Sequence, residues 1–345
     1  MAYDPINGNT VTIKKGAKAP TTMDALIKAS IERNLAKYDS TIFAETTDYV
    51  FVPMVAGNAT VIENCAIVTN CVGEKVIDVS IFEMTDGCNL CIREMTRGAK
   101  DLYEINVLNE PSPILRQRTT VLQAMNVLNS ALKTSWLGNK AYTTSDMASA
   151  ALLPAYKLEN GFWTKLVGLS PAPPNVPITN NALTTPPTQI AISQVQVLDI
   201  LDAMIAAQSQ TLRSIDDAEK VFIVTNEMFQ ALDAVVRREA LTNLLVYGFD
   251  QITNERYIRY GAFKIYSNND LSNAIRDLDL VGTGNDLLQL PHRAILQIGL
   301  PFFGMVNMPV FKEFYKETTS NWEAATTQTV ISPNPYGASF YVTAY

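Results

Sequence analysis

Histidine is nearly absent from this chain of 345 residues, which contains a single one, His292. Triad hydrolases and metal-dependent oxidases normally use histidine as a base or a metal ligand, so this scarcity excludes most enzymes of those classes. A nucleophilic pair of His292 with Cys88 or Cys91 is conceivable, but a histidine at the start of a strand is far more often a core or surface residue. The sequence therefore predicts no catalytic residue, no cofactor and no enzymatic activity.

Cysteine is also scarce, and its four copies, Cys65, Cys71, Cys88 and Cys91, lie within 27 residues. The two-residue spacing of Cys88 and Cys91 suits one half of a zinc site if Asp86-Gly87 forms a turn before them. The spacing of Cys65 and Cys71 is wider than in a usual zinc knuckle. Zinc binding, late disulfides and free thiols all stay open, buried thiols are favoured, and no metal ligand is predicted.

Charged residues make up only 18% of the chain, and 27 basic against 34 acidic side chains leave a net charge of −7. A dedicated nucleic-acid surface needs a basic face, so sequence-specific DNA binding is disfavoured. The first 40 residues differ, with six basic residues against four acidic ones, so residues 41–345 carry a net charge of −9. This basic segment is either a solvated tail or a contact for an acidic neighbour.

Long apolar runs are missing as well. No window of about 18 consecutive apolar residues occurs, and the amino terminus lacks the pattern of a secretory signal. We therefore expect no membrane association and expect the protein to be made and folded in a cytoplasm. The hydrophobic share of 47% is typical of globular proteins, and 345 residues can form one large domain or two medium ones.

The clearest helical pattern runs from Ser112 to Gly138. Ser112 precedes Pro113, a combination that starts helices well, and Gly138 provides a stop. In between, apolar side chains recur at steps of three and four residues, at Val121, Met125, Leu128, Leu132 and Trp136. At ~1.5 Å per residue this helix spans roughly 35–40 Å and can cross a whole domain.

The segment before this helix changes character twice. Residues 1–20 show no periodicity and are expected to form an extended arm, and helical spacing follows over residues 21–38. Residues 41–95 have β character, with strands expected at 49–52 and 61–68. Because turn residues separate these strands, we expect them to pair locally and to project from the body.

After the long helix, seven prolines make residues 139–188 a connector, with Phe162 and Trp163 anchoring it to a core. Residues 193–268 then predict the order helix, strand, helix, strand. The expected elements are a helix capped by Ser193 with apolar residues as far as Leu212, a strand at Lys220–Thr225, a helix capped by Asn226, a loop after Gly248 and a strand at Ala262–Ser267. The uninterrupted apolar run of the first strand predicts that both of its faces are buried.

The last part of the chain predicts more strands, at residues 292–299, 309–317, 327–332 and 339–343. Residues 302–345 contain ten of the thirty aromatic side chains, so this end is expected to lie in a core or an interface. Gly282–Asp286 is interpreted as a plain turn, since no phosphate-binding strand and helix flank it, and Asp277 and Asp279 as a solvated edge. The fold class predicted from these elements is α+β.

In this order, the segments resemble the major capsid protein of tailed bacteriophages with the Hong Kong 97 fold. The segments that carry the resemblance are VLNSALKTSWLGNK (Val127–Lys140), KVFIVTNEMFQAL (Lys220–Leu232), YGAFKIYSNNDLS (Tyr260–Ser272, similar to the family's returning strand and loop), RAILQIG (Arg293–Gly299) and the final FYVTAY. The resemblance covers most of residues 41–345 and rests on segment order. It implies a spine helix, a peripheral domain, an axial domain, an extended loop and an N-terminal arm.

The resemblance also implies a division of the chain and a function. The N-terminal arm and first helix would be residues 1–40, the extended β-rich loop 41–95, the spine helix and peripheral segment 96–191, the axial domain 192–300, and the C-terminal strands of the core 301–345. The function implied is a capsid protein that assembles into pentamers and hexamers of an icosahedral head and encloses double-stranded DNA without binding a specific sequence. Such a protein is located in the virion and is assembled in the bacterial cytoplasm.

Two family features lack a counterpart here. Some members begin with a long charged helical scaffold, whereas only about 20 residues precede the first expected helix, so a separate scaffolding protein is possible, alongside portal and decoration proteins. Some members crosslink a lysine to an asparagine, and although Lys75 lies in the extended loop, no pattern identifies such a pair. The alternatives are an encapsulin-like compartment and another phage structural protein, such as a tail protein.

Overall fold

The structure is a computed structural model of the chain. It describes residues 35, 37–43, 49–53, 74–91, 113–179, 183–184, 188–189, 191–238, 245–250, 255–278, 290–316, 321–335 and 337–345. The predicted arm, nearly all of the predicted helix at 21–38, the predicted strand at 61–68, Cys65, Cys71, Asp279 and the turn at 282–286 lie outside these residues. Helices and strands are mixed throughout, as the predicted α+β class requires.

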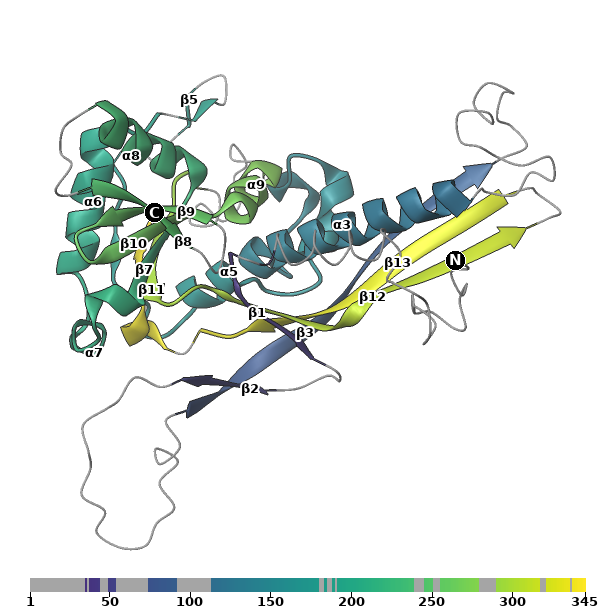
Figure 1. Ribbon diagram of the computed structural model, residues 1–345, viewed down its shortest axis with the longest axis horizontal. Helices are drawn as coiled ribbons and strands as arrows, with labels where there is room; N and C mark the ends of the chain where they lie inside the picture. Colours follow the sequence, from purple (N-terminus) through teal and green to yellow (C-terminus); the bar gives the residue numbers. More distant parts are fainter. Residues whose placement is uncertain are drawn as a thin grey trace, which may run out of the picture.

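A seven-stranded mixed sheet forms one end of the molecule (Figure 1). In spatial order its strands are β4 (Asn175–Val176), β14 (Val342–Ala344), β11 (Ala294–Ile298), β7 (Lys220–Val224), β10 (Phe263–Ser267), β9 (Glu255–Tyr260) and β8 (Leu245–Asp250). The central strand β7 pairs in parallel with β10 and antiparallel with β11, and all five of its residues are buried. The prediction of a strand buried on both faces is therefore confirmed.

This sheet separates two hydrophobic clusters. Phe222 and Val224 of β7 belong to the cluster under helices α6 (Gln194–Ala206) and α8 (Asn226–Arg238), whereas Val221 and Ile223 belong to the cluster under the long helix α3 (Pro113–Leu137) and α9 (Asn269–Asp277). Successive side chains of a strand point to opposite faces, so one strand contributes to both clusters. Both cores therefore depend on the same sheet.

The long helix is confirmed within a residue at each end, since α3 spans Pro113–Leu137 and Gly138 follows it. It lies along a second sheet, a ribbon of long strands that extends away from the first sheet (Figure 1). The strands of this sheet, in spatial order, are β1 (Asp39–Phe43), β12 (Phe302–Lys316), β13 (Asn321–Pro333), β3 (Glu74–Cys91) and β2 (Tyr49–Pro53). Thus β1, from the N-terminal part of the chain, pairs in parallel with β12, from the C-terminal part.

The expected pairing of residues 41–95 holds only in part. β2 pairs locally with β3, from Tyr49 with Asp78 to Pro53 with Glu74, but β3 also pairs along most of its length with β13 from the C-terminal region. The turn expected at Asp86-Gly87 is wrong, because these two residues continue β3 and pair with β13. The turn that a zinc knuckle at Cys88 would need is therefore not formed.

The connector contains more structure than its prolines suggested. It holds the short helices η3 (Thr144–Asp146), η4 (Ala150–Leu152), α4 (Leu153–Tyr156) and α5 (Phe162–Val167), with β4 and the two-residue strands β5 (Leu183–Thr184) and β6 (Thr188–Gln189). Pro154 sits in the first turn of α4, where a helix loses no hydrogen bond to proline. Trp163 is fully buried, so the predicted anchor is confirmed, although it lies on a helix.

The first part of the region after the connector matches the sequence closely. Ser193 caps α6 as predicted, accepting a hydrogen bond from the Gln196 amide at 3.2 Å. The helix ends at Ala206, and Leu212 lies on a separate short helix, α7 (Gln210–Arg213), because the Ser209 side chain caps a new start. The 3-10 turn η5 (Asp217–Glu219) then leads into β7, and α8 begins at Asn226 itself.

Two expectations between α8 and β11 are wrong. The loop expected after Gly248 is the hairpin of β8 and β9, and the loop expected after β10 is α9. Asn268 caps α9, accepting a hydrogen bond from the Leu271 amide at 2.8 Å.

The C-terminal strands are longer than expected. β12 begins at Phe302 rather than near Pro309, and its register with β13 shifts between Val306 and Val310. Proline lacks an amide donor, so an irregular ladder at this position has a local cause. The strand expected at 339–343 is the 3-10 helix η7 (Ala338–Phe340) followed by β14.

Candidate functional site

Of the residues considered for chemistry, His292, Cys88 and Cys91 are described, and they lie in different parts of the fold. His292 is buried just before β11 in the seven-stranded sheet, whereas Cys88 and Cys91 belong to β3 in the other sheet. Figure 1 shows the carboxyl end of β3 at the opposite end of the molecule from β11. Within the described part of the chain, no group of three histidine, cysteine or acidic residues could hold a metal ion. None of the described helices is long and apolar enough to cross a membrane.

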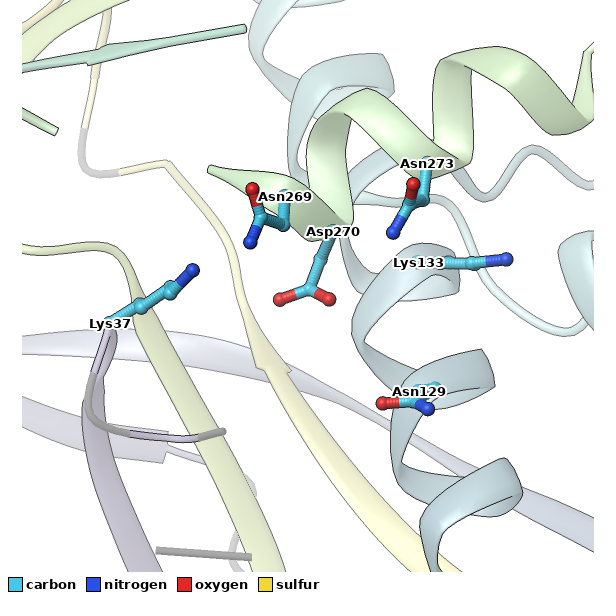
Figure 2. A pocket seen from close by; sticks show the side chains of 6 residues that line it. All are labelled: Lys37, Asn129, Lys133, Asn269, Asp270 and Asn273. Atoms are coloured by element: carbon cyan, nitrogen blue, oxygen red, sulfur yellow. The ribbon is translucent and has the colours of Figure 1, made fainter. Parts of the chain in front are cut away.

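A polar hollow lies between the segment before β1, helix α3 and the start of α9 (Figure 2). It is open to solvent and has a volume of about 330 Å³. Its lining residues are Lys37, Asn129, Lys133, Asn269, Asp270 and Asn273. Figure 2 shows Lys37 across from the α9 residues, with Asn129 and Lys133 on α3.

Tyr38 connects the three walls of this hollow. Its hydroxyl donates to the Asp270 carboxylate at 2.8 Å and accepts from the Trp136 indole nitrogen at 2.9 Å. Burial raises the pKa of Tyr38 well above its usual value, and the Asp270 charge adds to this shift. Burial also raises the pKa of Asp270, against the opposing effects of the Tyr38 hydrogen bond and of Lys37 and Lys133. The hydroxyl therefore stays protonated and holds the N-terminal segment against α3 and α9.

A second polar contact joins α3 to the far end of α9. The Lys133 ammonium and the Tyr156 hydroxyl both donate to one carboxylate oxygen of Asp277, at 2.8 and 2.9 Å. Burial, followed by the Asp277 charge, raises the pKa of Tyr156. The expectation that Asp277 forms a solvated edge is wrong, because α3 and α4 provide donors for it. Like Tyr38, this contact fixes elements in place and presents no paired nucleophile and base.

The sequence pattern does not indicate that Arg293 is buried. Arg293, one residue before β11, is fully buried, its Nε donates to the Leu290 carbonyl at 3.0 Å, and its guanidinium lies 5.1 Å from the Trp163 ring. Burial lowers its pKa to about 10. This cation packs where the seven-stranded sheet meets α5, and it acts as part of the core.

Exposed apolar side chains gather on one edge of the seven-stranded sheet. β8 is the edge strand, and it carries Val246, Tyr247 and Phe249, which are 46%, 38% and 59% exposed. The other large exposed apolar residues of the described chain are Leu122, Leu158 and Val195. Natural proteins usually protect an exposed edge strand with charge or with a covering element. This edge is therefore a candidate surface for contact with another molecule.

Comparison with known proteins shows similarity in three dimensions only. No protein-family model matches the chain, and no curated protein matches it in sequence. A chain in the structure of the satellite phage P4 procapsid, which includes the size determination (Sid) protein, superposes with a TM-score of 0.54 at 10% identity, over 96% of this chain and 92% of that chain. The capsid of Myoviridae phage XM1 contains a chain with a TM-score of 0.47 at 9% identity, over 90% of this chain and 89% of that one. The capsid of the native GTA particle contains one with a TM-score of 0.47 at 10% identity, with coverage of 91% and 89%.

The likeness to the P4 procapsid chain extends over nearly the whole of both chains and is close enough to define a shared fold. The protein therefore has a phage capsid fold, and the prediction of such a fold from the order of segments is confirmed.

Proposed function

We propose that this protein is the major capsid protein of a tailed bacteriophage, a structural shell protein without enzymatic activity. The observation that carries the proposal is the fold shared with a phage procapsid chain over 96% of the sequence. Copies would form pentamers and hexamers and close into an icosahedral head around double-stranded DNA. A net charge of −7 agrees with a shell that encloses DNA without gripping it.

The proposal includes the domain map of the Hong Kong 97 fold. α3 would be the spine helix of a peripheral domain that includes residues 96–191, and residues 192–300 would form the axial domain at the five-fold and six-fold axes. The strands of 301–345 would contribute to the core of both, since β12 and β13 lie in the ribbon along α3 and β14 lies in the seven-stranded sheet. Residues 41–95 would be the extended loop and 1–40 the N-terminal arm. The ribbon of β3, β12 and β13 along α3, and the separate sheet that α6 and α8 cover, support this division.

Portal, scaffolding and decoration proteins are the expected partners, the virion is the expected location, and the bacterial cytoplasm is the expected site of assembly. Two other functions use related architectures. An encapsulin-like compartment would enclose a cargo enzyme in place of DNA. A tail protein would be nearly all strand, and the 25-residue helix α3 argues against it.

Negative-stain microscopy of the expressed protein tests the proposal. Closed shells or rings are expected under some condition of salt, crowding or scaffold addition, and particles isolated from infected cells should contain DNA. A protein that stays monomeric under every assembly condition would contradict the shell function. Shells that contain a cargo enzyme and no nucleic acid would favour the encapsulin-like alternative.

A further inference from the structure

Two small patches, each made of one valine and two residues of like charge, lie on opposite sides of the seven-stranded sheet. The first, the basic row, is Val246, Arg259 and Lys264, which are direct cross-strand neighbours on β8, β9 and β10. Val246 is 46% exposed and Arg259 is exposed, while Lys264 is half-buried with its ammonium 5.4 Å from the Tyr257 ring. The second patch, the acidic stripe, is Val195, Asp199 and Asp202 on α6, where Val195 is 69% exposed and both acids are exposed. Asp202 also accepts a hydrogen bond from the Tyr260 hydroxyl of its own copy, so Asp199 is the acid left without a hydrogen bond between side chains of the described residues.

The two patches face in opposite directions. Leu245, Ile258 and Ile265 point into the cluster that α6 covers. Their neighbours Val246, Arg259 and Lys264 must therefore point to the other face, because side chains alternate along a strand. Within one copy, α6 therefore does not cover the basic row. The α6 helix of a second copy, placed beside the first, can reach it.

The patches also match in length and in order. Neighbouring strands lie about 4.8 Å apart, so the basic row extends over roughly 10 Å from Val246 to Lys264. Residues 195, 199 and 202 lie on one helix face, and seven residues at about 1.5 Å rise also extend over roughly 10 Å. Each patch begins with one exposed valine and continues with two charges of one sign. α6 contains no basic residue that would oppose the contact.

We propose that the basic row of one copy binds the acidic stripe of the next copy, with Val246 against Val195 and Arg259 against Asp199. This inference rests on the proposed shell function and names the surfaces that meet within one ring of subunits. The contact joins two different patches, so it is heterologous and can close into a ring. Complementary charge sets the register of the contact, and the valines add the apolar area that is lost from water.

Charge reversal tests this contact. Asp199→Lys and Arg259→Glu each replace an attraction with a repulsion and should weaken each contact about fivefold, an effect repeated at every contact of the ring. We expect the fraction of protein in particles, measured by sedimentation at 0.15 M salt, to fall by roughly tenfold or more for each single variant. The double variant Asp199→Lys/Arg259→Glu should recover assembly. Lys157→Glu, a reversal at an exposed lysine outside both patches, is the matched control and should assemble normally.

A mixture of the two single variants gives a further readout. In a ring where the variants alternate, every contact joins opposite charges, so a 1:1 mixture should form rings with even numbers of subunits although each variant alone assembles poorly. Circular dichroism and thermal melting confirm that each variant is folded. Normal assembly of both single variants, or failure of both the double variant and the mixture, would overturn this contact and leave the shell function standing. A wild-type protein that never assembles would overturn both.

Discussion

At the scale of single residues, the hydroxyl of Tyr38 joins three elements through hydrogen bonds and its place in the chain. It accepts from Trp136 on α3 and donates to Asp270 on α9, and its own segment continues directly into β1. Polar groups buried in this way are stabilising only while each one keeps its partner. The contribution of these contacts to stability can therefore be measured by removing a single hydroxyl group.

Tyr38→Phe should lower the free energy of unfolding by about 1–3 kcal/mol, because the buried Trp136 Nε1 and the half-buried Asp270 each lose a hydrogen-bond partner. Urea denaturation followed by tryptophan fluorescence measures this change. Tyr142→Phe is the matched control, since Tyr142 is equally buried but its hydroxyl has no hydrogen-bond partner among the described residues. The control should change stability by no more than about 0.5 kcal/mol. Equal effects of the two variants would contradict the role of Tyr38.

Asp270 should make stability depend on pH. Burial raises its pKa above the ordinary value of 3.8, so the folded state holds this proton more tightly than the unfolded chain does. The wild-type protein therefore loses stability as pH rises from 3.8 through the folded pKa. Asp270→Asn removes this dependence, so the stability of the variant relative to wild type should increase with pH over that window. Denaturation curves at several pH values measure the difference, and a difference that is constant with pH would contradict a raised pKa.

At the scale of elements, helix starts follow local rules and strand pairs do not. Ser193, Ser209 and Asn268 each cap a helix through their side chains, so the start of α6 could be predicted from the sequence. β8 could not. Its Gly248 is typical of a turn, but the ring of Tyr257 on β9 occupies the space where a side chain at position 248 would lie, 2.2 Å from the nearest ring atom. Only the pairing of the two strands shows that Tyr257 fills the space beside this glycine.

Ser193→Ala should cost about 0.5–2 kcal/mol of stability, because the Gln196 amide loses its acceptor at the start of α6. Ser149→Ala is the control: Ser149 precedes η4 in the equivalent position but makes no capping hydrogen bond. Its replacement should cost no more than about 0.5 kcal/mol. Thermal melting of both variants gives the comparison, and a larger loss for Ser149→Ala would refute the assignment of the cap.

At the scale of the whole molecule, the two hydrophobic clusters share the strands of one sheet. Phe222 packs on the α6 side and Ile223 on the α3 side, although they are adjacent in β7. Neither cluster can lose its strands without exposing the other. The proposed peripheral and axial domains should therefore unfold together in an isolated subunit.

Calorimetry of the unassembled protein should show one unfolding transition. Phe222→Ala should destabilise it by about 3–5 kcal/mol and Ile223→Ala by about 2–5 kcal/mol, and both should shift the same transition. Two transitions, each sensitive to only one of the variants, would show that the clusters are independent.

The sequence by itself determined the elements that depend on neighbours along the chain. Capping residues and apolar spacing were enough to predict α3, α6 and β7. The order of these elements was also enough to indicate a phage capsid fold. Each of these features is local or compositional, so it can be predicted without knowing which segments meet.

The tertiary structure alone decided which distant segments meet. β1 pairs with β12, β3 pairs with β13, and Tyr38 bonds to Asp270 across 232 residues of sequence. It also placed the basic row and the acidic stripe on opposite sides of one sheet. These relations depend on how the faces of helices and sheets pack in space. The period of a strand or helix indicates which residues share a face, but it does not indicate which other element will pack against that face.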